Sequence, residues 1–367
     1  MSVQPQVPEG TLATNEITRE ELQLATRNHG MPLEALRYDV TPTGLHYLLI
    51  HYDIPHVDPT TWSLEVDGAV ARPARYTLED LRSREVVTRP ATMECAGNGR
   101  ARLSPRALSQ PWLLEAVGTG MWSGTPLWPL LEEAGLASDV VDIVFTGLDR
   151  GREGGIEQHY QRSLTLDQAR DDGALLVYEL NGAPLPPQHG FPLRLLVPGW
   201  YGMTNVKWLG RITASREPFT GYQQTRSYRY RDEPDEVGEP VTRIQVRSLM
   251  IPPGVPDFFT RERHVTGGSV LLEGRAWSGA GAITRVEVSV DGGEHWDEAE
   301  VDAPVDDYVW QAWRWQWDAT EGTYELVCRA GDAARFRQPL EHRWNLGGYA
   351  DNTVQRLRVV VTDGGDA

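Results

Sequence analysis

Short apolar runs separated by polar turns fill the chain from Leu45 to about residue 221, and their period changes along the way. Residues 61–68, 86–98, 142–148, 174–182 and 193–199 have the length and composition of short strands, whereas residues 76–84 and 127–136 space their apolar side chains as helices do. Strands and helices that alternate in this manner predict a mixed α/β or α+β domain. We place this domain over residues 45–228.

Beyond residue 240 the pattern changes to strands and turns. Residues 269–279, 283–301, 308–319, 322–332 and 354–363 alternate β-branched or aromatic side chains with polar ones, and no helical period accompanies them. The Asp291-Gly292-Gly293 break predicts a hairpin. Five such segments in ~120 residues predict an immunoglobulin-like β-sandwich over residues 241–363. The tryptophan-rich segment 310–317 is interpreted as sandwich core and dimer face.

Two segments outside these domains are polar. Residues 1–44 are expected to form an N-terminal arm, and the first 30 residues carry one helix candidate, Thr18 to Arg27. Thr18 followed by Glu21 has the pattern of a capping box, and the remainder of these 30 residues is expected on the surface. Residues 229–240 carry charges, two prolines and a glycine, which is the composition of an inter-domain linker.

Charge and composition narrow the classes of function. The chain has 367 residues, enough for two domains, and a formal net charge of -17 that is spread along its length. Such a charge opposes binding to nucleic acid. It would favour encounter with a basic electron carrier, although solubility alone explains it.

The cysteine count and the hydropathy of the sequence bear on the compartment in which the protein is expected. The two cysteines, Cys95 and Cys328, predict neither a disulfide framework nor a multi-cysteine metal site. The sequence has no haem-attachment motif, no export signal in its first residues and no apolar run of the ~20 residues that a membrane-spanning helix needs. We therefore expect a cytoplasmic protein without a membrane span.

The segment Met93 to Arg100, MECAGNGR, is the first candidate for chemistry. A predicted strand ends in Cys95, and the two glycines that follow allow backbone N–H groups to approach a ligand closely. The charge of Arg100 would favour the thiolate form of the cysteine. Taken alone, a cysteine in such a loop is more often a small buried apolar residue than a metal ligand.

A second cluster lies within residues 189–212, where glycines and prolines require tight bends between short strands. His189, Arg194 and Lys207 carry cationic side chains suited to an anionic group such as phosphate, which Arg194 can bind through two parallel hydrogen bonds. The alternative is a set of exposed cations on loops.

Several long motifs in one order carry a family resemblance. CAGNGR resembles the cysteine loop of sulfite oxidases and eukaryotic assimilatory nitrate reductases, and YELNG-PLP-HGFPLR-LVPG-GM-NVKWLGRI resembles their cofactor-binding stretch. The opening HYDIP-VDP-W-LEVDG, the segment PW-LEAVGTGMWSGTPL, and the later AWSG, VSVDGG-W and WNL-G elements also match in order and spacing. The resemblance covers residues 45 to about 362.

This resemblance implies a sulfite-oxidase-type molybdopterin-binding domain followed by a dimerisation domain, and therefore an α+β protein that forms a homodimer. It also implies one molybdenum-molybdopterin cofactor per chain, with the metal held by the dithiolene of one pyranopterin, by oxo or hydroxo groups and by the thiolate of Cys95. Soft sulfur ligands suit a metal of this kind. Because the chain carries no haem domain, electrons would pass to a separate acceptor.

The resemblance also assigns residues. Those assigned to the cofactor are His51, Cys95, Asp149, His189, Arg194, Asn205, Val206 and Lys207, and those assigned to catalysis are Cys95, Arg100, Trp112 and Tyr228. Arg100 would bind an oxyanion, Trp112 would form a wall of the pocket, and the Tyr228 hydroxyl would hydrogen-bond the reacting oxygen. His51 and Asp149 could each instead be loop residues with local partners, and Tyr228 an exposed tyrosine of the linker.

Two departures from the family bear on the substrate. Leu49 or Ile50 stands where sulfite oxidases carry an arginine in the opening motif, and Ala282 lies near a second missing arginine. Both arginines should face the anion, and each charge-assisted hydrogen bond contributes about 1.5–3 kcal/mol. Their loss would weaken sulfite binding by orders of magnitude unless other cations substitute. The candidates for substitution are Arg102, Arg106, Arg150 and Arg152.

The leading hypothesis is therefore oxygen-atom transfer that oxidises sulfite or a related sulfur compound. Reduction of nitrate or of an S- or N-oxide, and oxidation of sulfane sulfur, are alternatives that the same metal centre permits. A hypothesis of another class is a non-catalytic scaffold protein that has lost its cofactor, and the intact loop around Cys95 argues against it.

Overall fold

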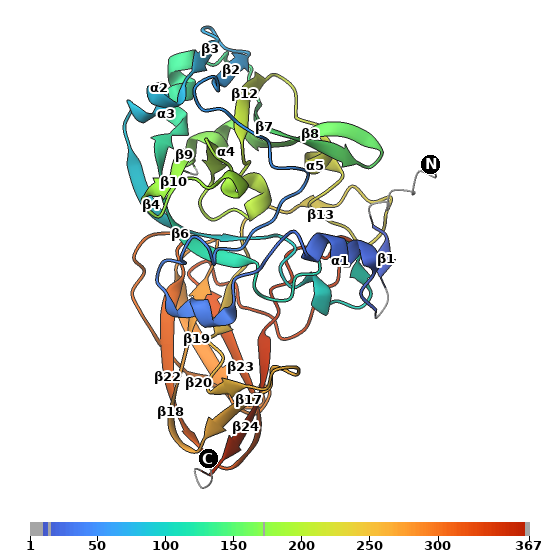
Figure 1. Ribbon diagram of the computed structural model, residues 1–367, viewed down its shortest axis with the longest axis vertical. Coiled ribbons are helices and arrows are strands. Elements are labelled where there is room, and N and C mark those ends of the chain that lie inside the picture. The colour runs from blue at the N-terminus through green and yellow to red at the C-terminus, as the bar shows by residue number, and fades with distance from the viewer. Residues whose placement is uncertain (1–9, 14–15, 172, 364–367) are drawn as a thin grey trace.

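The computed structural model describes residues 10–13, 16–171 and 173–363. Figure 1 shows two bodies stacked along the long axis, a mixed body of sheets and short helices and a body built from strands that carries the C-terminal end. Within the described residues, no helix is both long and apolar enough to cross a membrane.

Two five-stranded sheets form the first domain. The first sheet contains β4 (Val87–Glu94), β6 (Val117–Pro126), β9 (Leu175–Leu180), β10 (Ala183–Pro184) and β11 (Arg194–Leu196), in the order β10-β9-β6-β4 with β11 also on β9. The second contains β2 (Leu64–Gly68), β3 (Ala74–Tyr76), β7 (Asp142–Glu153), β8 (Ile156–Thr165) and β12 (Leu209–Ser215), in the order β3-β2-β12-β7-β8. Only β12 and β2 run parallel among these pairs of described strands.

One apolar core lies between the two sheets. It joins Leu64 and Ile212 of the second sheet to Leu176 and Leu195 of the first, all of them buried. The short helices α2 (Leu78–Arg82), α3 (Leu127–Ala134), α4 (Leu166–Asp171) and α5 (Tyr222–Thr225) connect the strands. Because the sheets share this core, the loops at their ends hold fixed positions relative to one another. The predicted α+β class is confirmed.

The second domain is the predicted β-sandwich. One sheet contains β15 (Arg247–Met250), β18 (Gly268–Trp277), β21 (Glu300–Val301) and β22 (Gln311–Ala319); the other contains β16 (Val255–Pro256), β17 (Arg263–Thr266), β19 (Ile283–Ser289), β20 (Asp297–Glu298), β23 (Gly322–Asp332) and β24 (Gln355–Thr362). The predicted hairpin joins β19 to β20, and Gly292 and Gly293 have positive φ at its turn. Trp313 and Trp317 are buried, so their segment belongs to the sandwich core as predicted.

The segment predicted as a linker folds back on itself. In residues 229–240, β13 (Arg229–Tyr230) pairs with β14 (Glu239–Pro240) in antiparallel register, while the residues between them are largely exposed. The chain thus begins the sandwich beside the point where it leaves the first domain. This pairing keeps Tyr228 close to the domain junction.

The N-terminal arm packs more tightly than its polar composition predicts. Helix α1 (Arg19–Ala25) has the predicted capping box, with both reciprocal hydrogen bonds between Thr18 and Glu21. Met31 and Leu36 are fully buried, and Leu36 lies in the 3-10 turn η1 (Leu33–Arg37). The carbonyl of Leu36 accepts a hydrogen bond of 2.7 Å from Arg275 of the sandwich. The expectation of a surface segment was therefore wrong for much of this arm.

An ion pair inside the protein joins the two domains next to the cysteine loop. The Glu94 carboxylate lies 3.0 Å from Nε of Arg247, and both side chains are fully buried. The same carboxylate accepts hydrogen bonds from Nε1 of Trp277 at 2.8 Å and from Nδ2 of Asn98 at 3.0 Å. Glu94 therefore connects the end of β4 and the cysteine loop to two strands of the sandwich.

A second buried pair anchors the arm. Arg106 in β5 (Arg106–Ala107), which pairs with β1 (Leu12–Ala13), donates two hydrogen bonds of 2.9 Å to the Glu21 carboxylate. Burial opposes ionisation of Glu21, but the hydrogen bonds from Arg106 and Thr18 outweigh it and hold the pKa of this carboxyl below its usual value. The pair therefore ties α1 to the segment that follows the cysteine loop.

We predict that Glu21→Ala lowers the free energy of unfolding by about 3 kcal/mol, because it leaves Arg106 without its buried carboxylate. The matched control is Glu20→Ala, which removes an exposed carboxylate from the same helical turn. Since the folded pKa of Glu21 is depressed, its contribution is present at neutral pH and is lost as the pH falls through that folded value. Urea unfolding at several pH values measures both effects. Equal stability of the two variants at pH 7 would refute the anchoring role.

Candidate functional site

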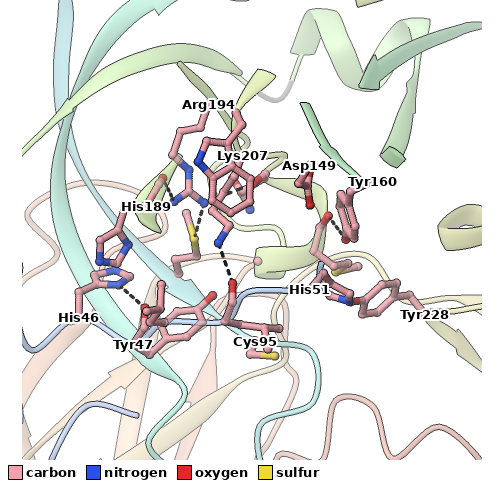
Figure 2. A pocket seen from close by; sticks show the side chains of 17 residues that line it. His46, Tyr47, His51, Cys95, Asp149, Tyr160, His189, Arg194, Lys207 and Tyr228 are labelled. Atoms are coloured by element: carbon pink, nitrogen blue, oxygen red, sulfur yellow. Dashed lines mark hydrogen bonds between the residues drawn. The ribbon is translucent and has the colours of Figure 1, made fainter. Parts of the chain in front are cut away.

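The loops at the ends of both sheets surround a cavity of about 640 Å³, counted to its open mouth. It is lined by eight of the predicted site residues, which are His51, Cys95, Asp149, His189, Arg194, Asn205, Lys207 and Tyr228. Figure 2 shows that the cationic side chains lie at one end and that His51, Tyr160 and Tyr228 lie at the other.

Three side chains with basic groups gather at the first end. Arg194 donates hydrogen bonds to the backbone oxygens of His189 at 3.0 Å and Asn205 at 3.2 Å, while its Nε has no partner. Lys207 donates to the carbonyls of Leu49 at 2.7 Å and Gln188 at 3.1 Å. Throughout the part of the chain that the structure describes, no acidic side chain forms an ion pair with either cation. His189 lies in the turn η3 (Pro187–His189) beside them.

Burial acts on all three basic groups. It lowers the pKa of Lys207 to about 7 and that of Arg194 to about 10. The pKa of His189 falls to about 2, first through burial and then through the neighbouring His46, Arg194 and Lys207. A bound anion would reverse these shifts, since it favours the charged forms. The cavity end is therefore suited to a phosphate-like group.

Asn205 and Val206 serve the framework in this structure. The Asn205 side chain accepts a hydrogen bond of 2.7 Å from the Val197 backbone and donates to the carbonyl of Tyr201 at 3.1 Å, which fixes the loop around η4 (Gly202–Thr204). Val206 packs into the main core, and its carbonyl accepts a hydrogen bond from Leu195. Both residues place Lys207 without pointing free polar groups into the cavity.

Asp149, near the middle of β7, offers an open acceptor. Its carboxylate is buried and Oδ1 has no hydrogen-bond partner. Burial raises the pKa of Asp149 to about 7, and the charge of Lys207 opposes this rise. A buried carboxylate with an open acceptor suits the N–H groups of a heterocycle such as a pterin.

Cys95 directly follows β4 and lines the cavity. Its Sγ is 3.4 Å from the backbone N–H of Gly97, which donates to it. Burial raises the pKa of the thiol, and this effect outweighs the opposing influence of Arg100, Gly97 and Trp112. The expectation that Arg100 favours the thiolate is thus correct in sign but insufficient alone. A metal ion would supply the missing charge, because a coordinating thiol is deprotonated.

Arg100 and Trp112 lie beside the cavity and do not line it. Arg100, in η2 (Arg100–Arg102), donates to the carbonyls of Gly347 at 3.0 Å and Gln110 at 3.4 Å, and its guanidinium lies 5.1 Å from the ring centre of Tyr349. Trp112 is buried, and its Nε1 has no hydrogen-bond partner. The structure therefore brings both residues near Cys95 without a direct opening toward the cavity.

Tyr228 is buried, so the alternative of an exposed linker tyrosine is wrong. Its hydroxyl is 2.9 Å from Nε2 of His51, and its ring centre lies 5.0 Å from that of Tyr349, with the two rings tilted by 38°. The backbone of Tyr228 has φ of 56°, a conformation that costs a bulky residue energy and is common at functional sites. His51 and Tyr228 together form the second end of the cavity.

The four arginines considered as substitutes for the missing family arginines do not reach the cavity. Arg102 donates to backbone carbonyls before β24, and Arg106 pairs with Glu21. Arg150 and Arg152 are on the surface. Leu49 itself lines the cavity, whereas Ala282 lies in a sandwich loop.

Sequence analysis missed three residues around the cavity. His46 and Tyr160 line it, and Arg162 lies behind Tyr228 with its guanidinium 5.6 Å from the ring centre. Tyr160 and Arg162 are two residues apart on β8, so both side chains point to one face of the strand. A strand prediction for residues 156–165 would have provided that signal, but this segment reads as polar.

These residues fit a metal cofactor that carries its own chelating group and an anion. The cavity supplies one thiol, two cations that form no ion pair with an acidic side chain of the described residues, and an open carboxylate oxygen. Among the described residues, the one group of three or more side chains with metal-binding spacing is Asp291, Glu294 and His295, exposed on the β19–β20 turn away from the cavity. Cys95 would therefore be a single protein ligand to a metal whose other ligands come from an organic group.

Comparison with known proteins agrees with this description. The oxidoreductase molybdopterin binding domain matches residues 51–223, and the Mo-co oxidoreductase dimerisation domain matches residues 239–362. The mitochondrial sulfite oxidase of Homo sapiens is 34% identical over 342 residues, which cover 88% of this chain and 62% of that protein. The NAD(P)H nitrate reductase of Hordeum vulgare is 32% identical over 356 residues, which cover 88% of this chain and 39% of that protein.

A solved structure also matches. The sulfane dehydrogenase SoxCD from Paracoccus pantotrophus superposes with a TM-score of 0.79 and 26% identity, covering 90% of this chain and 83% of that one. The chain spans about three fifths of the length of the sulfite oxidases and about two fifths of that of the nitrate reductases.

The open carboxylate of Asp149 leads to a prediction about the cofactor-free protein. Because its folded pKa of about 7 lies above the usual value of 3.8, the wild type loses stability as the pH rises between these values. Asp149→Asn has no such titration and should be more stable than wild type at pH 8 by roughly 3 kcal/mol. Its retention of the pterin should fall, since an amide accepts hydrogen bonds less strongly than a carboxylate.

Urea unfolding of both cofactor-free proteins from pH 4 to pH 8, together with the pterin content of protein from a cofactor-producing host, checks this prediction. A stability difference that does not change with pH would show that Asp149 is not a buried, unpaired carboxylate.

Proposed function

We propose that this chain, which belongs to the sulfite-oxidase-type family of molybdopterin oxidoreductases, oxidises sulfite or a related sulfur compound by oxygen-atom transfer. A separate acceptor takes the electrons. The observation that carries the proposal is a buried cysteine at a cavity in which Arg194 and Lys207 form no ion pair with an acidic side chain of the described residues.

Different residues of the chain would bind different parts of the cofactor. Cys95 provides the protein thiolate to the metal. Arg194, Lys207 and His189 hold the phosphate, and Asp149 accepts hydrogen bonds from the pterin. When bound, the cofactor supplies the oxygen-atom and electron-transfer chemistry, while the protein contributes orientation, charge and exclusion of water.

The second end of the cavity would receive the substrate. Tyr228 is positioned to donate its hydroxyl hydrogen to an oxygen of the substrate, with Nε2 of His51 as its partner in the structure. Trp112 lies beside the cavity, so we assign it no direct contact with the substrate. Arg100 is bound to two backbone carbonyls, so we assign it an electrostatic contribution to anion binding and no direct contact.

One observation favours a sulfane-sulfur substrate as the second candidate. Leu49, one of the two residues expected at the place of a missing family arginine, lines the cavity and makes this wall apolar. An apolar wall lowers affinity for a small, strongly hydrated anion and suits a larger sulfur compound. Nitrate reduction gains no support from the same replacement, because the related nitrate reductases carry the same arginine.

We predict that Cys95→Ala retains part of its molybdenum through the phosphate and pterin contacts but loses sulfur oxidation by at least a hundredfold, on the order of the loss when a metal centre is disturbed. Cys328→Ala is the matched control, since this cysteine is buried in the sandwich core. The measurements are metal content and turnover of sulfite and thiosulfate-derived compounds with ferricyanide, and of nitrate with reduced viologen.

Two outcomes would contradict the proposal. Nitrate reduction without oxidation of any sulfur compound would reverse the proposed direction. Wild-type protein from a molybdate-replete host that contains neither molybdenum nor pterin would support a non-catalytic scaffold.

We further propose a homodimer formed through the sandwich, on the basis of the matching dimerisation domain. Light scattering should give about twice the chain mass of 41.1 kDa, and a monomer mass at working concentration would refute it. Localisation in the cytoplasm stays a prediction.

A further inference from the structure

Two guanidinium groups and two phenol rings form a continuous series of contacts near Cys95. Arg162 lies over the ring of Tyr228 at 5.6 Å, the ring centres of Tyr228 and Tyr349 are 5.0 Å apart with the rings tilted by 38°, and Arg100 lies over Tyr349 at 5.1 Å. The four residues come from β8, the segment after α5, the loop before β24, and η2. We name this set the arginine–tyrosine stack.

Arg162 is the unusual member of the stack. Its side chain is fully buried, it donates one hydrogen bond to the carbonyl of Gln223, and its Nε has no partner. No acidic side chain of the described residues forms an ion pair with it. Arg100, by comparison, is also buried but donates to two backbone carbonyls. An arginine remains protonated even when buried, so Arg162 brings an uncompensated positive charge into the protein.

The charge of Arg162 lies behind Tyr228, at the substrate end of the cavity. Arg162 does not line the cavity, and Tyr228 separates the two. A cation on one face of a phenol ring attracts the ring and limits its rotation. Tyr228 also has a left-handed backbone, so its orientation depends on contacts made by the side chain. The hydroxyl of Tyr228 then points to His51 across the cavity end.

We propose that Arg162 is a positioning residue that holds Tyr228 in its reactive orientation and supplies positive potential to the oxyanion subsite in place of the family arginine missing from the opening motif. This proposal rests on the proposed function for the identity of the reaction, although anion binding can be measured without turnover. Low dielectric around a buried charge lets its field act beyond direct contact.

The test compares holoenzyme variants Arg162→Met and Arg162→Lys with wild type. The control is Arg170→Met, which removes a surface arginine from α4. Three quantities are measured: KM and kcat for the best sulfur substrate, and the dissociation constant of sulfate, a redox-inert oxyanion, by calorimetry. We expect Arg162→Met to raise KM and the sulfate dissociation constant about tenfold and to lower kcat about tenfold.

Arg162→Lys separates charge from geometry. It keeps the charge, so sulfate should bind within about threefold of wild type, whereas the loss of the planar stack should still lower kcat about threefold or more. The control should match wild type in all three quantities. If Arg162→Met does not fold, judged by its circular dichroism and melting temperature, the lysine variant carries the test alone. A lysine variant with wild-type kcat would overturn the positioning role.

The outcomes distinguish this inference from the proposed function. The inference is overturned if Arg162→Met has unchanged KM and sulfate binding, or if wild type does not bind sulfate. In either case the proposed function stands as long as wild type oxidises a sulfur compound. Conversely, sulfate binding that depends on Arg162 in a protein that oxidises no sulfur compound upholds the anion subsite and refutes the function.

Discussion

The buried ion pair between Glu94 and Arg247 is the constraint on which the site depends. It joins the residue before Cys95 to the sandwich, and Asn98 and Trp277 bind the same carboxylate. A buried pair of this kind need not increase stability over an apolar alternative, but breaking it leaves an uncompensated charge. Its effect here is on position: when both domains are docked, the pair holds the cysteine loop in a single place.

The cavity, unlike the Glu94–Arg247 pair, contains charged groups that no ion-pair partner compensates among the described residues. Arg194 is buried and Lys207 is partly buried, neither forms an ion pair with an acidic side chain of the described residues, and Asp149 retains an open acceptor. Such groups destabilise a protein unless a ligand compensates them. The surrounding framework tolerates them because Asn205 and the backbone carbonyls fix each cation in place. Rigid placement of unsatisfied groups is what a preorganised binding site requires.

Local sequence patterns identified much of this architecture. The capping box of α1, the Asp291-Gly292-Gly293 turn and the alternating strands of the sandwich depend on neighbours within a few residues, so the sequence alone predicts them. The roles assigned to the cofactor and catalytic residues came from the family resemblance, and the structure places most of those side chains around one cavity.

Contacts between distant segments could not be predicted in this way. The arm is polar, yet Met31 and Leu36 become buried because the docked domains provide an apolar surface. The Glu94–Arg247 pair spans the domain junction, and the local sequence around neither residue predicts it. Arg162 lies in a polar segment whose strand was not recognised, and Arg100 donates to the carbonyl of Gly347, in the segment before the C-terminal strand. Tertiary contacts decide these positions.

The central claim is that the Cys95 sulfur binds the metal of a cofactor held in this cavity. X-ray absorption at the molybdenum edge tests it most directly, because it counts the sulfur atoms around the metal. The account predicts one fewer sulfur neighbour in Cys95→Ala than in wild type, with the remaining coordination preserved. An identical sulfur shell in the two proteins would contradict it.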